Sequence, residues 1–308
     1  MDFTKMHGAA NDFVVVDGRD TQRDWSSMAI TVCDRHRGIG CDSLIVISAS
    51  DKADFGMRTF DTDGSEAETC GNGLRCVARY VLEKGLVKPD AEEITIETIS
   101  AVNTIKLEKE NGKVVKFWAN MGRPRLDAAQ IPVDLEAGDG EFAKVDSMIV
   151  YKEKINGIEV TLNLVSMGNP HAVFFTIDPV ADFPMVKIGP LVEKLPIFPH
   201  RVNFEVARVL NKDRIEARVW ERGVGETMAC GSGTCAIAVA SRICGYTEAK
   251  VQVNLPGGVL DALFNGSGEV VLGGPAVIVF EGKWPERGVN TDDENRPEDR
   301  RAKTLPVC

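Results

Sequence analysis

Two segments of this chain, 160 residues apart, repeat each other without a gap, and this repeat constrains the fold more than any other feature. Cys70 aligns with Cys230, and each cysteine opens a Cys-Gly-x-Gly step. A register shared over about 16 residues predicts two domains built on one plan. The matched positions are Arg58 and Arg218, Phe60 and Trp220, Asp61 and Glu221, Glu66 and Glu226, Gly71 and Gly231, and Gly73 and Gly233.

A helix is predicted directly after each cysteine. Apolar residues at i, i+3, i+4 and i+7 make 71–84 an amphipathic helix, and 232–244 is apolar on all sides, so that helix should be buried. The remaining segments are short and rich in Val, Ile, Phe and Thr, which is typical of strands. The expected strands are 12–17, 44–48, 56–61, 94–98, 103–107, 114–118, 148–151, 159–165, 172–177, 202–209, 215–220, 250–254, 259–264, 270–272 and 276–280.

Domain boundaries follow from breaks in this pattern. The stretch 121–140 carries two prolines and several acidic residues and is typical of a connection between domains. We therefore expect a first domain at 1–125 and a second at 126–274. The end, 284–308, is crowded with charge and proline and should lie outside the core.

Composition excludes several functional classes. A net charge of −10 with no block of Lys and Arg argues against a general nucleic-acid binder. The N-terminus has no apolar signal-like region, and no apolar run reaches the length of a membrane span. Eight cysteines without a secretion signal are expected to be reduced thiols, so we expect a cytoplasmic protein.

The repeated cysteines carry the functional hypothesis. A single cysteine at a helix start is more often a small buried residue, but two at equivalent positions favour a shared role. A thiol at a helix N-terminus is expected to have a lowered pKa because it faces unpaired N–H groups. The glycines after each cysteine leave backbone amides open to the oxygen atoms of a ligand.

Two similar acid–base groups on opposite walls of a cleft are suited to inverting the configuration of a carbon atom that bears a hydrogen. One group removes the proton from one face, and the other returns a proton to the opposite face. The amides at the helix ends would stabilise the charge that develops on a carboxylate. Two other classes are disfavoured: the cysteines lack the C-x2-C spacing of zinc or iron–sulfur sites, and a redox protein normally pairs its thiols in one short motif.

Motifs in a fixed order give the chain a family resemblance. It resembles the diaminopimelate epimerases over nearly its whole length, up to about residue 280. The segments that carry the resemblance are KMHGAANDF at 5–13, GIGCD at 38–42, DGSE at 63–66, CGNGLRC at 70–76, GNPH at 168–171, RVN at 201–203, ERG at 221–223 and ETMACGSGT at 226–234.

The resemblance implies an α/β (α+β) fold of two pseudo-symmetric domains, each a curved mixed sheet around a central helix. It implies that 275–283 returns to the first domain and that the protein is a homodimer. The implied reaction is interconversion of LL- and meso-diaminopimelate without pyridoxal phosphate, metal or other cofactor, in lysine and peptidoglycan-precursor biosynthesis. The expected partner is a small amino-acid substrate.

The resemblance also assigns roles to individual residues. Cys70 and Cys230 match the catalytic thiols. Substrate-binding positions are matched by Asn11, Gly71, Asn72, Asn169, Asn203, Glu221, Arg222, Gly231 and Ser232. His171 and Glu221 match residues that tune the thiols.

Three positions depart from the family pattern. Ala10 replaces a glycine, Ser43 stands where many members have glutamine, and Asp61 stands where asparagine is common. A carboxylate at position 61 accepts hydrogen bonds but cannot donate an amide N–H. A related amino-acid racemase with another side-chain preference is therefore the alternative interpretation.

Overall fold

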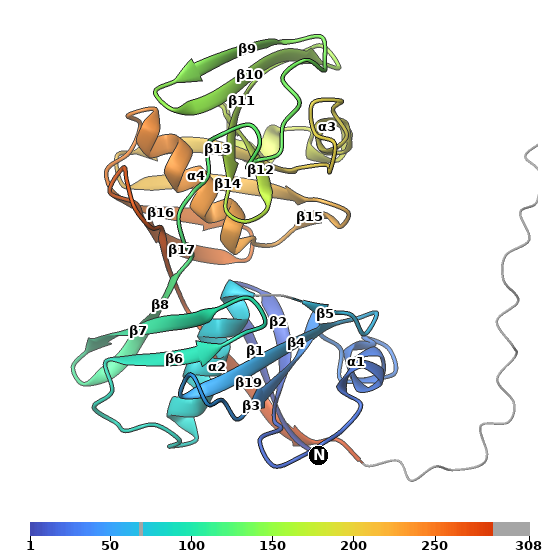
Figure 1. Ribbon diagram of the computed structural model, residues 1–308, viewed down its shortest axis with the longest axis vertical. Helices are drawn as coiled ribbons and strands as arrows, with labels where there is room; N and C mark the ends of the chain where they lie inside the picture. The colour runs from blue at the N-terminus through green and yellow to red at the C-terminus, as the bar shows by residue number, and fades with distance from the viewer. Residues whose placement is uncertain (68–69, 286–308) are drawn as a thin grey trace, which may run out of the picture.

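The computed structural model describes residues 1–67 and 70–285 and forms two sheet-and-helix units, one above the other in Figure 1. We call them the first unit (β1 to β8 with β19) and the second unit (β9 to β18). The first unit contains β1 (Asp2–Gly8), β2 (Asn11–Asp17), α1 (Trp25–Cys33), β3 (Ser43–Ser48), β4 (Phe55–Asp61), β5 (Glu66–Ala67), α2 (Gly71–Glu83), β6 (Glu93–Glu97), β7 (Val102–Glu110), β8 (Lys113–Asn120) and β19 (Val277–Lys283).

The second unit follows the same plan with one more strand. It contains β9 (Glu141–Val145), β10 (Met148–Ile155), β11 (Ile158–Ser166), β12 (Pro170–Phe175), the 3-10 helix η1 (Val180–Asp182), α3 (Met185–Glu193), β13 (Asn203–Asn211), β14 (Arg214–Glu221), β15 (Gly225–Thr227), α4 (Gly231–Ile243), β16 (Lys250–Leu255), β17 (Gly258–Leu263) and β18 (Val271–Gly274).

Strand pairing repeats between the units. The order is β19-β1-β2-β3-β4-β6-β7-β8 in the first and β10-β11-β12-β13-β14-β16-β17-β18 in the second. Parallel pairs fall at equivalent places, β2–β3 and β4–β6 in one unit and β12–β13 and β14–β16 in the other. The predicted two-unit α+β fold is confirmed, and the repeat extends far beyond the 16 residues visible in the sequence.

The units are joined edge to edge by β8 and β18, which pair antiparallel. Because β19 pairs with β1, the chain crosses back to the first unit after β18. Trp118 of β8 packs flat over Gly273, where an added methyl group would lie 2.7 Å from the ring. The contact between the two units is therefore stabilised by side-chain packing as well as by backbone hydrogen bonds.

A repeated ion pair fixes the hairpin before each central helix. Arg58 binds both carboxylate oxygens of Glu66 at 2.6 and 2.7 Å, and Arg218 binds both oxygens of Glu226 at 2.6 and 3.0 Å. Such two-point contacts hold both side chains in one orientation. The hairpins β4–β5 and β14–β15, which precede α2 and α4, are therefore held by the same contact.

Each unit buries its central helix in an apolar cluster. Leu74, Val77 and Val81 of α2 are almost fully buried against strands of the first unit, and Ile237 and Val239 of α4 are buried in the second. Burying apolar side chains on this scale is the main source of stability in such a fold. A second cluster in each unit packs α1 or α3 against the outer face of the sheet.

Other sequence expectations had mixed outcomes. The helices expected at 71–84 and 232–244 are α2 and α4, whereas α1 and α3 were not predicted. Trp284, expected to begin a tail outside the core, instead exchanges backbone hydrogen bonds with Met1 and packs on an apolar cluster. The rest of the expected tail, from residue 286, lies outside the described residues.

Candidate active site

Cys70 and Cys230 occupy the same local structure in the two units. Each is the N-cap of its central helix, with φ and ψ of −130° and 110° for Cys70 and −126° and 121° for Cys230. Each sulfur accepts a hydrogen bond of 3.4 Å from the backbone N–H three residues on, at Gly73 or Gly233. The glycine after each cysteine therefore begins the helix with its amide unencumbered by a side chain.

The N-termini of α2 and α4 meet over Leu272. A methyl group added at Gly231 would lie 3.1 Å from a Leu272 methyl and 4.0 Å from the side-chain oxygen of Asn72. A methyl group added at Gly71 would lie 4.0 Å from the same Leu272 methyl. The residues that follow the two thiols are thus close neighbours across the joint between the units.

The predicted lowering of the thiol pKa values is wrong. Burial raises the pKa of Cys70, while the Gly73 N–H and the charge of Arg75 act in the opposite direction. Burial raises the pKa of Cys230 more strongly, and the negative charge of Glu221 adds to the rise. Loss of hydration disfavours the thiolate more than the helix amides favour it.

A hydrogen-bond network on the first-unit wall links three predicted site residues. Asn72 donates to the side-chain oxygen of Asn11 at 3.0 Å, and the Cys70 sulfur lies 3.8 Å from that oxygen. Asn11 donates in turn to Asp42 at 2.8 Å. The geometry therefore brings Cys70, Asn72 and Asn11 together.

Arg75 supports this wall and was not identified from the sequence. Its side chain is fully buried and donates to the side-chain oxygen of Asn72 at 2.5 Å and to the Gly71 carbonyl at 3.3 Å. A buried guanidinium is costly unless its donors are satisfied, so this placement fixes both acceptors. In the sequence, an arginine inside an amphipathic helix does not indicate that its side chain is buried or that it supports a site.

A second network lies on the wall of the second unit. His171 contacts Glu205 through Nδ1 at 2.7 Å and Asn169 through Nε2 at 3.0 Å, and both His171 and Glu205 are fully buried. Asn169 donates to Ser232 at 3.2 Å, and Ser232 lies 3.4 Å from the Cys230 sulfur. His171 is therefore connected to Cys230 through Asn169 and Ser232.

Glu205 is a further site residue that the sequence did not reveal. Burial raises its pKa, against the opposing effect of His171. An added methyl group at Gly233 would lie 2.8 Å from its carboxylate, so Glu205 sits directly under the start of α4. In the sequence Glu205 is one polar residue in a strand, which is unremarkable.

The carboxylates at the repeated positions 61 and 221 are both anchored by hydroxyl groups. Ser43 donates to Asp61 at 2.9 Å, and Thr227 donates to Glu221 at 2.5 Å. Two of the departures from the family pattern, Ser43 and Asp61, are therefore one hydrogen-bonded pair.

Asn203 and Arg222 lie together at the edge of the second-unit wall. The Asn203 side chain is buried and bridges the Pro170 carbonyl at 3.1 Å and the Arg222 backbone N–H at 2.8 Å. The Arg222 guanidinium is exposed and donates to the His200 carbonyl at 3.1 Å. Asn203 thus positions the Glu221–Arg222 turn, and Arg222 keeps donors available for an anion.

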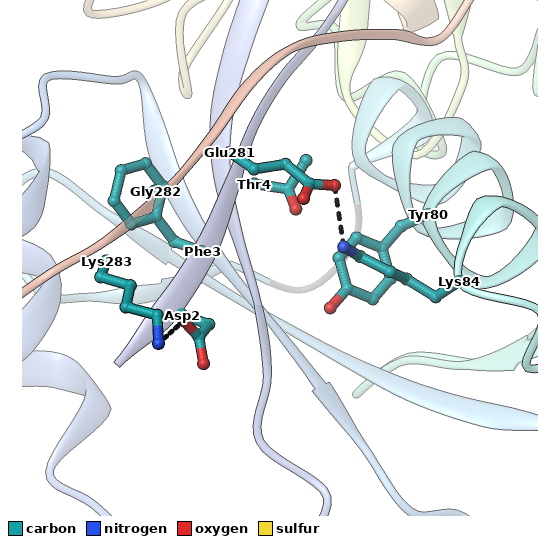
Figure 2. A pocket seen from close by; sticks show the side chains of 8 residues that line it. All are labelled: Asp2, Phe3, Thr4, Tyr80, Lys84, Glu281, Gly282 and Lys283. Atoms are coloured by element: carbon teal, nitrogen blue, oxygen red, sulfur yellow. Dashed lines mark hydrogen bonds and ion pairs between the residues drawn. The ribbon is translucent and has the colours of Figure 1, made fainter.

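A pocket elsewhere on the first unit is not part of this constellation. It has a volume of about 320 Å³ and lies near the C-terminal end of α2, which at ~1.5 Å per residue is about 15–20 Å from Cys70 at the other end of that helix. Figure 2 shows its charges already paired, Lys84 with Glu281 at 2.8 Å and Lys283 with Asp2 at 3.7 Å. Within residues 1–67 and 70–285, no group of three or more His, Cys, Asp and Glu side chains could hold a metal ion.

Comparison with solved structures defines the fold class. A phenazine biosynthesis protein of the PhzF family from Bacillus anthracis matches with a TM-score of 0.65 at 17% identity, over 92% of this chain and 98% of that chain. Two equivalent units, each with a sheet around a central helix, are the shared architecture.

The family follows from the sequence comparisons. The diaminopimelate epimerase model matches residues 3–126 and 163–279. A diaminopimelate epimerase from Acetivibrio thermocellus is 43% identical over 92% of this chain and 98% of its own length, and one from Moorella thermoacetica is 44% identical over 92% and 99%. The chain belongs to the diaminopimelate epimerase family, and it is an isomerase.

Proposed function

We propose that this protein interconverts LL- and meso-diaminopimelate, with Cys70 and Cys230 as the paired acid and base. The observation that carries the proposal is that two equivalent thiols each cap a helix, and the two helix ends meet over Leu272. The 43% identity to a diaminopimelate epimerase over nearly the full length supports the substrate.

The chemistry balances with protons alone. One sulfur, as thiolate, takes the α-proton and becomes a thiol, and the other thiol gives its proton to the opposite face of the carbon. The first N–H groups of α2 and α4, at Gly71, Asn72, Gly231 and Ser232, would bind the carboxylate whose charge grows in the transition state. The proposal therefore includes no pyridoxal phosphate, metal or other cofactor.

The raised thiol pKa values fit a site that is activated when substrate enters. Before binding, burial keeps both sulfurs protonated at neutral pH. The substrate brings an α-ammonium next to the thiols. A nearby cation favours one thiolate, while the other sulfur keeps its proton.

The polar edge of the site supports a substrate with charges at both ends. Arg222 offers a two-point partner for a distal carboxylate, and Asp61 offers one for an ammonium. Burying such a zwitterion without partners would be costly, so both groups are needed. Lysine, which has the distal ammonium but no distal carboxylate, would leave Arg222 without a carboxylate to bind.

Deuterium exchange at the α-carbon tests the substrate. We expect fast exchange with LL- and meso-diaminopimelate and exchange slower by about 10⁴-fold for lysine, because a site built for polar partners rejects analogues that lack them. Glutamate and histidine complete the panel. Comparable exchange for lysine and diaminopimelate would favour the alternative, a racemase of broader preference.

We further propose that the protein is a cytoplasmic homodimer with no nucleic-acid partner. Val279 and Phe280 on β19 are about half exposed, at 54% and 47%, which supports an apolar contact face there. The net charge of −10 supports the absence of a nucleic-acid partner, and the need for reduced thiols supports a cytoplasmic location. Among the described residues, no helix is long and apolar enough to cross a membrane.

A further inference from the structure

Two other cysteines lie side by side in the first unit, away from the catalytic pair. Cys33 ends α1, and Cys41 lies in the loop that leads to β3. Their sulfur atoms are 3.3 Å apart, and the Cys41 N–H donates to the Cys33 carbonyl at 3.2 Å. The two backbones are thus already held together next to the sulfurs.

We propose that Cys33 and Cys41 form a site of reversible oxidation, at which a peroxide converts the two thiols to a disulfide. A disulfide bond is about 2.05 Å long, so the sulfurs need to approach by only about 1 Å. The backbone hydrogen bond between the two residues holds their backbones close together, so closure needs only a small local shift of Cys41.

A pocket gives a small oxidant access to this pair. It has a volume of about 430 Å³, and its lining includes both cysteines together with Arg35 and Asp42. The sulfurs are otherwise buried, with 2% and 0% of the residue surface of Cys33 and Cys41 exposed.

The surroundings make Cys41 the attacking sulfur. The hydrogen bond between the two sulfurs lowers the pKa of Cys41, and the Lys5 ammonium also favours its thiolate, against the effect of burial. Lys5 is held in place by the Gly40 carbonyl and by Asp12. The same hydrogen bond raises the pKa of Cys33, which keeps its proton until the second step.

The reaction balances in two steps. The Cys41 thiolate attacks one peroxide oxygen, the O–O bond breaks, and hydroxide leaves with the electron pair, so Cys41 becomes a sulfenic acid. The Cys33 sulfur then attacks the Cys41 sulfur, the S–O bond breaks, and water leaves with the Cys33 proton. Two thiols and one hydrogen peroxide thus give one disulfide and two waters.

Oxidation here would be transmitted to the substrate site, an effect that rests on the proposed function. Asp42, next to Cys41, accepts hydrogen bonds from Asn11 at 2.8 Å and from the Asp12 N–H at 3.0 Å. Pulling Cys41 toward Cys33 displaces Asp42 and with it the Asn11 side chain. We therefore expect a severalfold rise in KM with a smaller change in kcat.

The test maps the disulfide and measures activity on the same sample. Purified protein is treated with equimolar hydrogen peroxide, free thiols are alkylated, and trypsin is added. Cleavage after Arg35 and Arg37 places the two cysteines in peptides 24–35 and 38–52, which only a disulfide would join. We expect the joined pair in the wild type and in the control Cys244→Ala, and reduction should restore the wild-type KM.

Cys33→Ala and a double variant, Cys70→Ser with Cys230→Ser, separate the possible outcomes. Cys33→Ala should epimerise normally and lose the reductant-reversible rise in KM, and the double variant should form the Cys33–Cys41 disulfide although inactive. Full alkylation of Cys33 and Cys41 after peroxide would overturn the site, and a disulfide without a change in KM would overturn its coupling to Asn11. A wild type that forms the disulfide but does not epimerise would overturn the proposed function alone.

Discussion

Ala10 carries backbone strain next to the substrate-site residue Asn11. Ala9 and Ala10 have φ values of 54° and 65°, in the left-handed region where a side chain is disfavoured. Their turn reaches the second unit: an added methyl group at Gly257 would lie 2.4 Å from the Ala9 carbonyl oxygen. The alanine that replaces the family's glycine therefore strains a turn that bridges the two units.

Ala10→Gly should stabilise the protein by about 0.5–1 kcal/mol, because glycine adopts a positive φ without steric cost. Urea unfolding monitored by circular dichroism measures the change. Ala143→Gly, at an exposed position of β9 with ordinary strand geometry, is the matched control and should be destabilising. Equal destabilisation by both substitutions would show that Ala10 is not strained.

The raised thiol pKa values predict an alkaline pH profile. A base whose pKa is raised gains thiolate with every unit of pH until that pKa is passed, so kcat/KM should rise about tenfold per unit from pH 7 toward 9. At higher pH, kcat/KM should fall only when the second thiol, which acts as the acid, also loses its proton. A kcat/KM that is constant from pH 6 to 9 would mean that the free enzyme already holds a thiolate.

At the scale of elements, Asp12 joins three parts of the first unit. From β2 its carboxylate binds Lys5 of β1 at 2.5 Å and Arg35 of the loop after α1 at 2.7 Å, and it accepts the Asp42 N–H at 3.2 Å. Burial acts to raise the pKa of Asp12, but the hydrogen bonds from Arg35 and Lys5 outweigh it and lower the pKa from 3.8 to about 2. The charged form is therefore the one that the fold stabilises.

This pKa makes a stability prediction with a defined sign. A lowered pKa contributes stability that is complete above about pH 4 and is lost as the pH falls toward 2, amounting to about 2 kcal/mol. Asp12→Asn should have a lower free energy of unfolding than the wild type at pH 7. This difference in free energy should disappear as the pH falls from 4 to 2. Asp90→Asn, an exposed position, should show no such pH-dependent gap. A gap that stays constant down to pH 2 would contradict the assignment.

Elements were predictable where the sequence repeats or alternates, and not elsewhere. The Cys-Gly-x-Gly steps located α2 and α4, but α3 was missed because Gly189 and Pro190 interrupt its pattern. The structure explains that glycine: an added methyl group would lie 2.5 Å from the Trp220 ring. Apolar patterning predicted the burial of α4, but it does not show whether an individual thiol, arginine or glutamate is buried. For this reason the predicted pKa direction of the thiols was wrong, and Arg75 and Glu205 were missed.

At the scale of the whole molecule, the candidate site exists only because two units face each other. We propose that they are separate domains, 1–125 with 275–283, and 126–274. The chain passes between the units twice, once after β8 and once after β18, and the strand pairings on either side of these connections support this division. The pairing of β8 with β18 and of β19 with β1 also fixes the orientation of one unit on the other. Each unit then supplies one thiol and one helix end to a shared substrate.

The most direct test of this account is proton exchange by single-thiol variants. Cys70→Ser and Cys230→Ser, each incubated with LL-diaminopimelate in deuterated water, should lose epimerisation while keeping the wild-type circular dichroism and melting temperature, because a hydroxyl is far too weak a base to replace a thiolate. Cys244→Ser, a half-buried thiol in neither proposed site, should behave as the wild type. If both variants fail to form meso-diaminopimelate, the two-thiol account stands; if either retains more than a few per cent of wild-type turnover, the account is contradicted.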